Sequence, residues 1–107
     1  MSIDLDRDSY DTAAAQAKGA VLVDFWGPQC KPCLALMPAI EQLEQEYAGR
    51  LTVARVNSVG NRMLCARLRV FGLPTFILYR DGVEKTRLTG EDTTAAQIRE
   101  AIERTIA

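Results

Sequence analysis

Residues 20–33 have the sequence AVLVDFWGPQCKPC, an apolar segment followed by two closely spaced cysteines. Ala20–Trp26 is short and almost continuously apolar, which is typical of a strand buried on both faces of a sheet. A Gly-Pro pair ends this strand, and Cys30 and Cys33 follow directly before a segment with helical periodicity. We therefore expect a Cys-x-x-Cys pair at the turn between a buried strand and a helix.

The position of this cysteine pair favours redox chemistry. The N-terminus of a helix has unpaired N–H groups and about half a positive charge, which favour a thiolate over a thiol at Cys30. Pro32 fits the first helical turn, where its missing N–H costs no hydrogen bond. The spacing lets Cys33 attack a mixed disulfide formed at Cys30, so that a reduced substrate leaves and an internal disulfide remains.

Three other interpretations of the cysteines fit the sequence less well. A buried structural pair is possible, but Cys-x-x-Cys between a strand and a helix is typical of redox motifs. A zinc site needs about four ligands, and the only soft ones are Cys30, Cys33 and Cys65. Haem attachment requires a histidine after the second cysteine, where this chain has Leu34. We therefore expect no metal and no organic cofactor.

The rest of the chain alternates between helical and extended patterns. The predicted helices are Ser9–Lys18 with Asp8 or Ser9 as its cap, a long helix after the cysteines to about Tyr47, a short one from Asn61 to about Leu68, and a last one opened by a Thr94–Gln97 capping box. The further predicted strands are Ile3–Leu5, Leu51–Val56, Thr75–Tyr79 and Val83–Leu88, with a hairpin turn at 80–82 and a bend at Gly90. This order predicts an α/β fold whose central mixed β-sheet is flanked by helices on both faces.

The composition fits one globular domain. The chain has 107 residues, 48% of them hydrophobic and 25% charged, which are ordinary values for a folded domain. A net charge of −1 gives no basic excess for nucleic acid, and the lack of histidine excludes Ser-His-Asp and Cys-His nucleophile systems. No apolar run approaches the roughly 18 residues of a membrane helix, and the acidic N-terminus does not resemble a signal peptide. We expect a cytoplasmic monomer with a single domain over residues 1–107.

Several segments together resemble the thioredoxin family. The likeness is carried by VLVDFW at 21–26, CKPC at 30–33, Pro38, LTVARVN at 51–57, GLPTF at 72–76 and Gly90. It covers nearly the whole chain and implies a thioredoxin-like fold. It also implies a thiol–disulfide oxidoreductase that reduces disulfides in other proteins and receives electrons from a separate donor of the thioredoxin reductase type.

The resemblance implies roles for individual residues. Cys30 would be the exposed attacking thiol and Cys33 the buried resolving thiol. Asp24 would be the buried carboxylate that takes a proton from Cys33 through water. Pro74 would be a cis proline facing the disulfide, and the backbone of Leu73 would pair with an extended substrate segment. The other expected members of the substrate-binding surface are Trp26, Gln29, Lys31, Pro32 and Gly90.

Asp24 also stands out on physical grounds, because a lone carboxylate in an apolar strand is costly unless it has a partner or a function. Burial raises the pKa of a carboxyl group, which suits a proton acceptor. The alternative is a structural ion pair with Arg55 on the neighbouring strand, where the family usually has Lys. Arginine stays charged and would hold Asp24 more firmly ionised.

The chain departs from the family around its cysteines. Gln29 stands where the family usually has Trp, Lys31 where it has Gly, and Leu34 where it has Lys, while the turn 58–60 lacks the usual Asp. Lys31 supports the thiolate and favours a more oxidising couple, whereas Pro32 is the family's mark of a reductant. We expect a reductant with an altered choice of partners. A disulfide oxidant or isomerase, and a non-enzymatic subunit that binds extended peptides, remain alternatives.

The third cysteine, Cys65, lies on the predicted short helix among apolar neighbours. We favour packing as a small hydrophobic residue, with a regulatory or intermolecular disulfide as the alternative. Arg62, Arg67 and Arg69 cluster nearby and predict a solvated face, or else a patch for an anionic partner.

Overall fold

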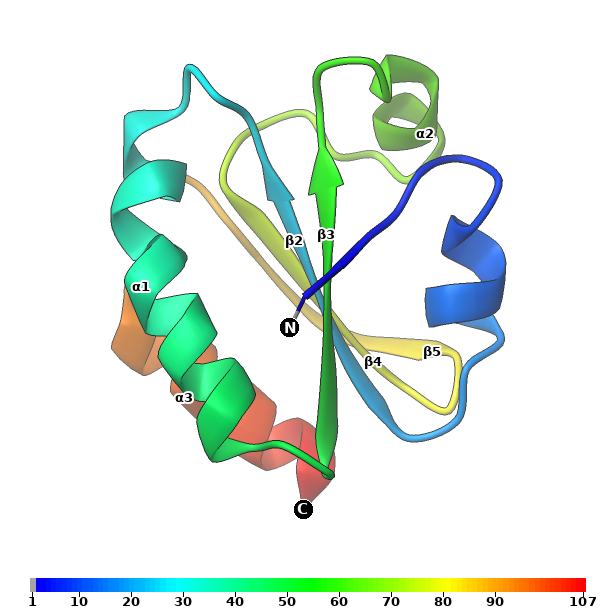
Figure 1. Cartoon of the computed structure of the whole chain (residues 1–107), viewed down its shortest axis with the longest axis vertical. Coiled ribbons are helices and arrows are strands. Elements are labelled where there is room, and N and C mark those ends of the chain that lie inside the picture. Colours follow the sequence, from blue (N-terminus) through cyan, green and yellow to red (C-terminus); the bar gives the residue numbers. More distant parts are fainter. Residues whose placement is uncertain (1) are drawn as a thin grey trace.

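The computed structural model describes residues 2–107. Its sheet contains β1 (Ile3–Asp4), β2 (Ala20–Trp26), β3 (Leu51–Asn57), β4 (Thr75–Arg80) and β5 (Val83–Thr89). The helices are the short π-helix η1 (Asp11–Ala15), α1 (Lys31–Glu46), α2 (Arg62–Arg67) and α3 (Ala95–Ile106). Figure 1 shows α1 and α3 on one side of the sheet, and α2 with the blue helix η1 on the other.

The sheet is mixed, with the strand order β1-β3-β2-β4-β5. Strands β1 and β2 run parallel to β3, whereas β4 runs antiparallel to β2 and β5. At the centre of the sheet, Asp24 of β2 is in register with Arg55 of β3 and Phe76 of β4. The predicted α/β architecture, a central mixed sheet with helices on both faces, is confirmed.

Strand β2 is buried on both faces, as its apolar composition predicts. Val21 and Phe25 belong to the core beneath η1 and α2, whereas Leu22 belongs to the core beneath α1 and α3. Because side chains alternate along a strand, Asp24 and Trp26 lie on the face that α1 and α3 cover. The one carboxylate of this strand therefore points toward the layer that carries the cysteine pair.

The first helix is shorter than the sequence predicts. Instead of a helix over Ser9–Lys18, the structure has only the five-residue π-helix Asp11–Ala15. The predicted cap is also wrong, because neither Asp8 nor Ser9 caps this helix through its side chain. Asp6 holds the turn before it, accepting hydrogen bonds at its Oδ1 from the backbone N–H groups of Asp8 and Ser9 at 2.9 and 3.0 Å.

Tertiary contacts at both ends of this segment explain its length. Tyr10 is fully buried, and its hydroxyl lies 2.7 Å from that of Tyr79 on β4. Further along, the N–H of Gly19 donates to Oδ1 of Asp81 at 2.7 Å. These two anchors fix the path of the chain across the sheet, so that packing overrides the helix propensity of the alanine-rich stretch.

The other local signals agree with the structure, with one exception. Asp81 and Gly82 have φ values of 52° and 82°. Positive φ at both central residues is what a two-residue hairpin turn of type I′ requires. The capping box over Thr94–Gln97 is present at the start of α3. Asn61 precedes α2 but makes no side-chain cap, and its amide Nδ2 donates to the carbonyl of Asn57 at 2.8 Å.

Candidate active site

The cysteine pair lies at the first turn of α1, directly after the loop that leaves β2. Cys30 is the N-cap residue of α1, and it forms a disulfide with Cys33 across a Cα–Cα distance of 5.2 Å. The backbone N–H of Cys30 donates to the carbonyl of Gly27 at 3.0 Å, which closes the loop between strand and helix. The predicted strand–turn–helix placement of the motif is confirmed.

The two sulfur atoms have different surroundings. The N–H of Cys33 donates to Sγ of Cys30 at 3.2 Å, so a backbone donor of the first helical turn points at that sulfur. Cys30 is partly exposed, whereas Cys33 is only 2% exposed. A helix N-terminus stabilises negative charge, so the accessible sulfur is the one placed to become a thiolate when the disulfide is reduced.

Asp24 is a buried acid on the same side of the sheet as α1. Asp24 is only 2% exposed, and this burial raises the pKa of its carboxyl to about 6. The positive charge of Arg55 lowers the pKa and so opposes part of the rise. Nε of Arg55 lies 3.5 Å from Oδ2, an ion pair without a hydrogen bond from Nε, and Oδ1 has no hydrogen-bond partner among the described residues. The ion pair with Arg55, which the sequence offered as the alternative role of Asp24, and the predicted rise in pKa are both present.

Arg55 also contacts Trp26, a relationship that was not predicted from the sequence. The guanidinium carbon lies 4.8 Å from the centre of the Trp26 ring, within the range of a cation–π interaction. The indole Nε1 is buried without a hydrogen-bond partner among residues 2–107, and so is Nη2 of Arg55. The available signal was the alternation of side chains, which places Asp24, Trp26 and Arg55 on one face of adjacent parallel strands.

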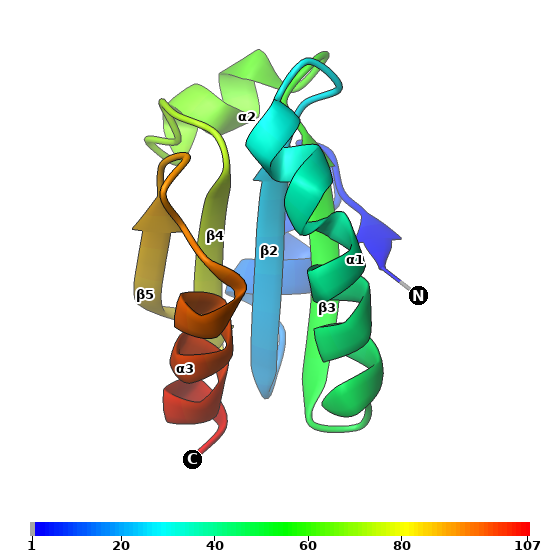
Figure 2. The same ribbon diagram turned by 90° about the vertical axis from the view of Figure 1, so that its left-hand side faces the viewer.

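The loop before β4 lies beside the cysteine loop. The Leu73–Pro74 peptide bond is cis, as expected, and Pro74 is buried. A Cβ built on Gly27 would be 3.3 Å from Cδ1 of Leu73, so this side chain packs against the residue whose carbonyl holds Cys30. The N–H of Gly90, which forms the predicted bend, donates to the carbonyl of Pro74 at 3.0 Å. Figure 2 shows the loop before α1 and the loop before β4 at the same end of the sheet.

The residues that depart from the family surround Cys30 at the surface. Gln29 and Lys31 are exposed, and Leu34 is 41% exposed. Pro32 occupies the first turn of α1, as predicted, and is half-buried. The structure therefore brings Trp26, the cysteine loop and the Leu73–Pro74 loop to one end of the molecule, while the roles of these residues in binding remain proposals.

Cys65 has the surroundings of a structural residue. It is 7% exposed, belongs to the core beneath η1 and α2, and is not part of a disulfide. Burial raises the pKa of its thiol, which disfavours the thiolate. The predicted packing as a small hydrophobic residue is confirmed. Nearby, Arg67 forms an ion pair with Asp11 at 3.3 Å.

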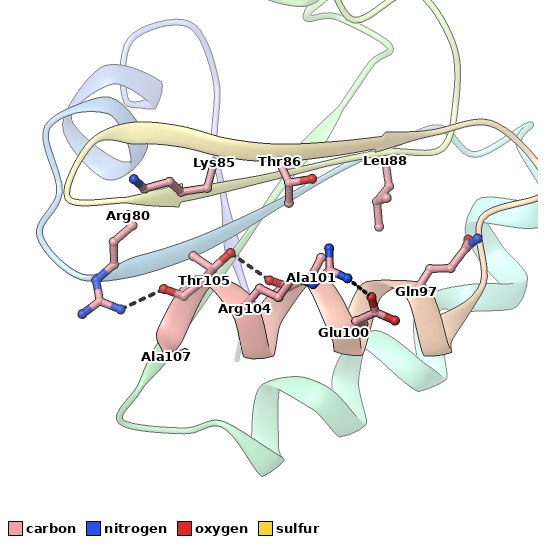
Figure 3. Close-up of a pocket in the computed structure, with 10 residues that line it drawn as sticks. All are labelled: Arg80, Lys85, Thr86, Leu88, Gln97, Glu100, Ala101, Arg104, Thr105 and Ala107. Atoms are coloured by element: carbon pink, nitrogen blue, oxygen red, sulfur yellow. Dashed lines mark hydrogen bonds and ion pairs between the residues drawn. The ribbon is translucent and has the colours of Figure 1, made fainter.

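A cavity away from the cysteines has a volume of about 650 Å³. It lies between β5 and α3, where Arg80 donates through Nη1 to the carbonyl of Thr105 at 2.9 Å (Figure 3). None of the predicted site residues lines it. Within residues 2–107, no group of three or more His, Cys, Asp or Glu residues is placed to hold a metal, and no helix is long and apolar enough to cross a membrane.

The two cysteines form a disulfide at the N-terminus of a helix that follows the central strand of a mixed sheet. This arrangement is that of a thiol–disulfide oxidoreductase. Comparison with known families agrees with that class. The family model for thioredoxin matches residues 1–104, and the chain belongs to the thioredoxin family.

Curated relatives extend over most of the chain. It is 39% identical over 103 residues to a thioredoxin from Acetoanaerobium sticklandii, covering 96% of this chain and 98% of that protein. It is 35% identical over 96 residues to a thioredoxin from Peptoclostridium acidaminophilum, covering 90% and 87%. It is also 36% identical over 81 residues to the chloroplastic thioredoxin X of Arabidopsis thaliana, covering 76% of this chain and 44% of that protein.

Proposed function

We propose that the protein reduces disulfides in other proteins through the Cys30–Cys33 couple and a mixed-disulfide intermediate. The observation that carries this proposal is the asymmetry of the pair, in which Cys30 is accessible and receives a backbone N–H while Cys33 is buried behind it. The accessible sulfur is suited to attack a substrate, and the buried one is suited to act only on a partner already attached to Cys30.

The proposed reaction transfers two electrons in two exchange steps. The Cys30 thiolate attacks one sulfur of the substrate disulfide, a mixed disulfide forms, and the other substrate sulfur leaves as a thiolate that takes up a proton. Cys33 then loses its proton and attacks Sγ of Cys30, which releases the second substrate sulfur as a thiolate that is protonated. The substrate gains two electrons and two protons, and the protein retains the Cys30–Cys33 disulfide.

Asp24 is the proposed acceptor of the Cys33 proton. Its carboxyl lies on the sheet face that α1 covers, and one oxygen has no hydrogen-bond partner among the described residues. A pKa of about 6 leaves this carboxyl ionised at neutral pH but basic enough to accept a proton. A water molecule between the two residues would carry the proton, since a buried polar oxygen offers a partner for such a water.

An extended segment of the substrate protein is proposed to bind across the two loops. The backbone of Leu73 would pair with this segment, and the surrounding surface would comprise Trp26, Gln29, Lys31, Pro32, Pro74 and Gly90. Support comes from the packing of Leu73 against Gly27 and from the hydrogen bond between Gly90 and Pro74. Peptide recognition by backbone pairing is tolerant of sequence, which suits an enzyme with many protein substrates.

Electrons are proposed to come from a separate donor of the thioredoxin reductase type, whose contact with this chain is altered at Gln29 and Lys31. Pro32 favours the reducing direction, which a cytoplasmic redox poise sustains and which would contribute to cell redox homeostasis. We propose that residues 1–107 act as one domain and as a monomer. Lys31 beside Cys30 favours a more oxidising couple, so disulfide oxidation or isomerisation is the second candidate function.

The test is insulin reduction driven by dithiothreitol. We expect the wild-type protein to accelerate precipitation of the insulin B chain and Cys30→Ser to abolish that acceleration, because the attacking sulfur is gone. The reduction potential of the Cys30–Cys33 couple, measured against glutathione, decides the direction. A wild-type protein that binds peptides but gives no more turnover than Cys30→Ser would be a binding subunit, and the proposal would be wrong.

A further inference from the structure

An apolar cavity lies between the start of α2 and the loop before β4. It has a volume of about 360 Å³, and the large side chains on its rim are unusually exposed, with Val59 63% and Phe71 82% exposed. Val70 and Leu73 contribute further apolar surface to its wall. A concave site rimmed by exposed hydrophobic side chains is typical of a place where an apolar group of a partner binds.

This cavity adjoins the cysteine loop. Ser58 and Leu73 both line it, and the same two side chains flank Gly27, on which a Cβ would lie 3.1 Å from Oγ of Ser58 and 3.3 Å from Cδ1 of Leu73. The carbonyl of Gly27 in turn holds the N–H of Cys30. A chain segment that lies along Leu73 to reach Cys30 therefore passes the mouth of the cavity. In an extended segment, alternate side chains would point into it.

The rim of the cavity carries a positive charge and, among the described residues, no negative one. Arg62 is the only charged side chain that lines the cavity; it is exposed and has no carboxylate within ion-pair distance among residues 2–107. Arg62 also lines a neighbouring hollow together with Asp6, Arg7 and Asp8, but no ion pair joins it to either carboxylate. An unpaired cation beside an apolar cavity favours a partner with an acidic group next to its apolar group.

We propose that this cavity, formed by Val59, Phe71 and Leu73 with Arg62 at its rim, selects substrate proteins whose disulfide-bearing segment carries a large apolar side chain next to an acidic one. The inference rests on the proposed function and names the substrate class of the same site. Phe71 supplies the apolar contact, and Arg62 supplies the charge preference. Neither residue acts on the sulfur atoms.

The test uses short peptide pairs joined by a disulfide, with a Phe-Glu step placed two, three or four residues from the cysteine on either side. Matched peptides carry Ala-Glu or Phe-Lys at the same positions. In the best register, we expect kcat/KM for Phe-Glu to exceed that for Ala-Glu about tenfold, as partial burial of one large side chain implies. The preference for Phe-Glu over Phe-Lys is expected to be about threefold and weaker at high salt.

Two pairs of variants distinguish the effect of the cavity on peptide preference from the effect of the rest of the surface. Phe71→Ser is expected to remove most of the preference for Phe over Ala, whereas Met63→Ser, which changes a 77% exposed side chain on α2 outside this cavity, keeps it. Arg62→Glu is expected to reverse the preference for Glu over Lys, whereas Lys85→Glu on β5 keeps it.

The outcomes distinguish this inference from the proposed function. If the wild-type protein gives no more insulin reduction than Cys30→Ser, the proposed function itself is wrong. If it reduces insulin and reduces all peptides with equal kcat/KM, the function stands and the cavity has no role in selection. If sedimentation shows a dimer that Phe71→Ser dissociates, the cavity is an interface between two copies, and the inference is overturned.

Discussion

The guanidinium group of Arg55 stacks on the indole of Trp26, with its carbon 4.8 Å from the ring centre. The same group lies beside Asp24, where Nε is 3.5 Å from Oδ2 without donating a hydrogen bond. Stacking holds the cation close to the carboxyl, but the carboxyl keeps one oxygen without a partner among residues 2–107. This arrangement explains why burial prevails over the ion pair and leaves the pKa of Asp24 at about 6.

Asp24→Asn is expected to slow resolution of the mixed disulfide about tenfold at neutral pH, because an amide cannot accept the Cys33 proton. The wild-type rate should rise with pH through about 6, where the pKa of the Asp24 carboxyl lies, and this rise should be absent in the variant. Stopped-flow measurements of substrate release across pH check both statements. The matched control is Asp92→Asn, an exposed acid on the loop before α3. An unchanged rate and pH profile in Asp24→Asn would remove Asp24 from the mechanism.

The same substitution is expected to stabilise the protein above pH 6. The pKa of the Asp24 carboxyl is raised from 3.8 to about 6 on folding, so the native state binds more protons than the unfolded state between these values. The wild-type protein therefore loses stability as pH rises from about 4 to about 6, and Asp24→Asn avoids the loss. We expect a gain of about 1–3 kcal/mol at pH 7 and little difference near pH 3, measured by urea unfolding of the oxidised protein.

Arg55→Met is expected to move the rise in rate to higher pH, because Arg55 is the charge that lowers the pKa of the Asp24 carboxyl. At pH 7 the rate of mixed-disulfide resolution should fall about threefold, as a smaller fraction of Asp24 is ionised. Arg55→Lys keeps the positive charge and should retain more of the wild-type profile, while both variants change the fluorescence of Trp26 by removing the stacked guanidinium. If the profile of Arg55→Met stays at the wild-type position, Arg55 does not tune Asp24.

Local signals predicted the parts of the fold that are decided within a few residues. The apolar run Ala20–Trp26 predicts a strand buried on both faces because no polar face is offered to water. The capping box at Thr94–Gln97 predicts the start of α3 because both side chains bond within the first turn. The placement of Cys30 and Cys33 at a helix start follows from the same local reasoning.

Features that depend on contacts between residues far apart in the chain could not be predicted from the sequence. The helix expected at Ser9–Lys18 is shortened because Tyr10 is bound to Tyr79 on β4, a contact that no local pattern encodes. The stacking of Arg55 on Trp26 depends on the register of two strands. The exposure of Phe71 depends on the path of the loop between α2 and β4, and an aromatic residue is ordinarily expected to be buried.

Gly82→Ala is expected to destabilise the protein by more than about 2 kcal/mol, as measured by urea unfolding. Gly82 has a φ of +82°, and a Cβ there would lie 2.3 Å from the carbonyl oxygen of Ala15, which is backbone and cannot move aside cheaply. Gly49→Ala provides the control, because Gly49 has a φ of +86° but no atom within 4 Å of an added Cβ. It should cost about 1 kcal/mol through backbone strain alone. Equal losses in the two variants would show that the contact with Ala15 contributes nothing.

Restoring the family's usual residues beside Cys30 is expected to improve electron delivery. Gln29 and Lys31 are both exposed at the mouth of the cysteine loop, where a reductase would make contact. The double variant Gln29→Trp, Lys31→Gly should be reduced by a bacterial thioredoxin reductase with a kcat/KM about fivefold higher than the wild-type value, because Trp offers a large apolar contact surface. Gln42→Trp places the same side chain on the exposed face of α1 and should give no gain. Turnover that stays at the wild-type level in the double variant would mean that this chain selects its electron donor through other residues.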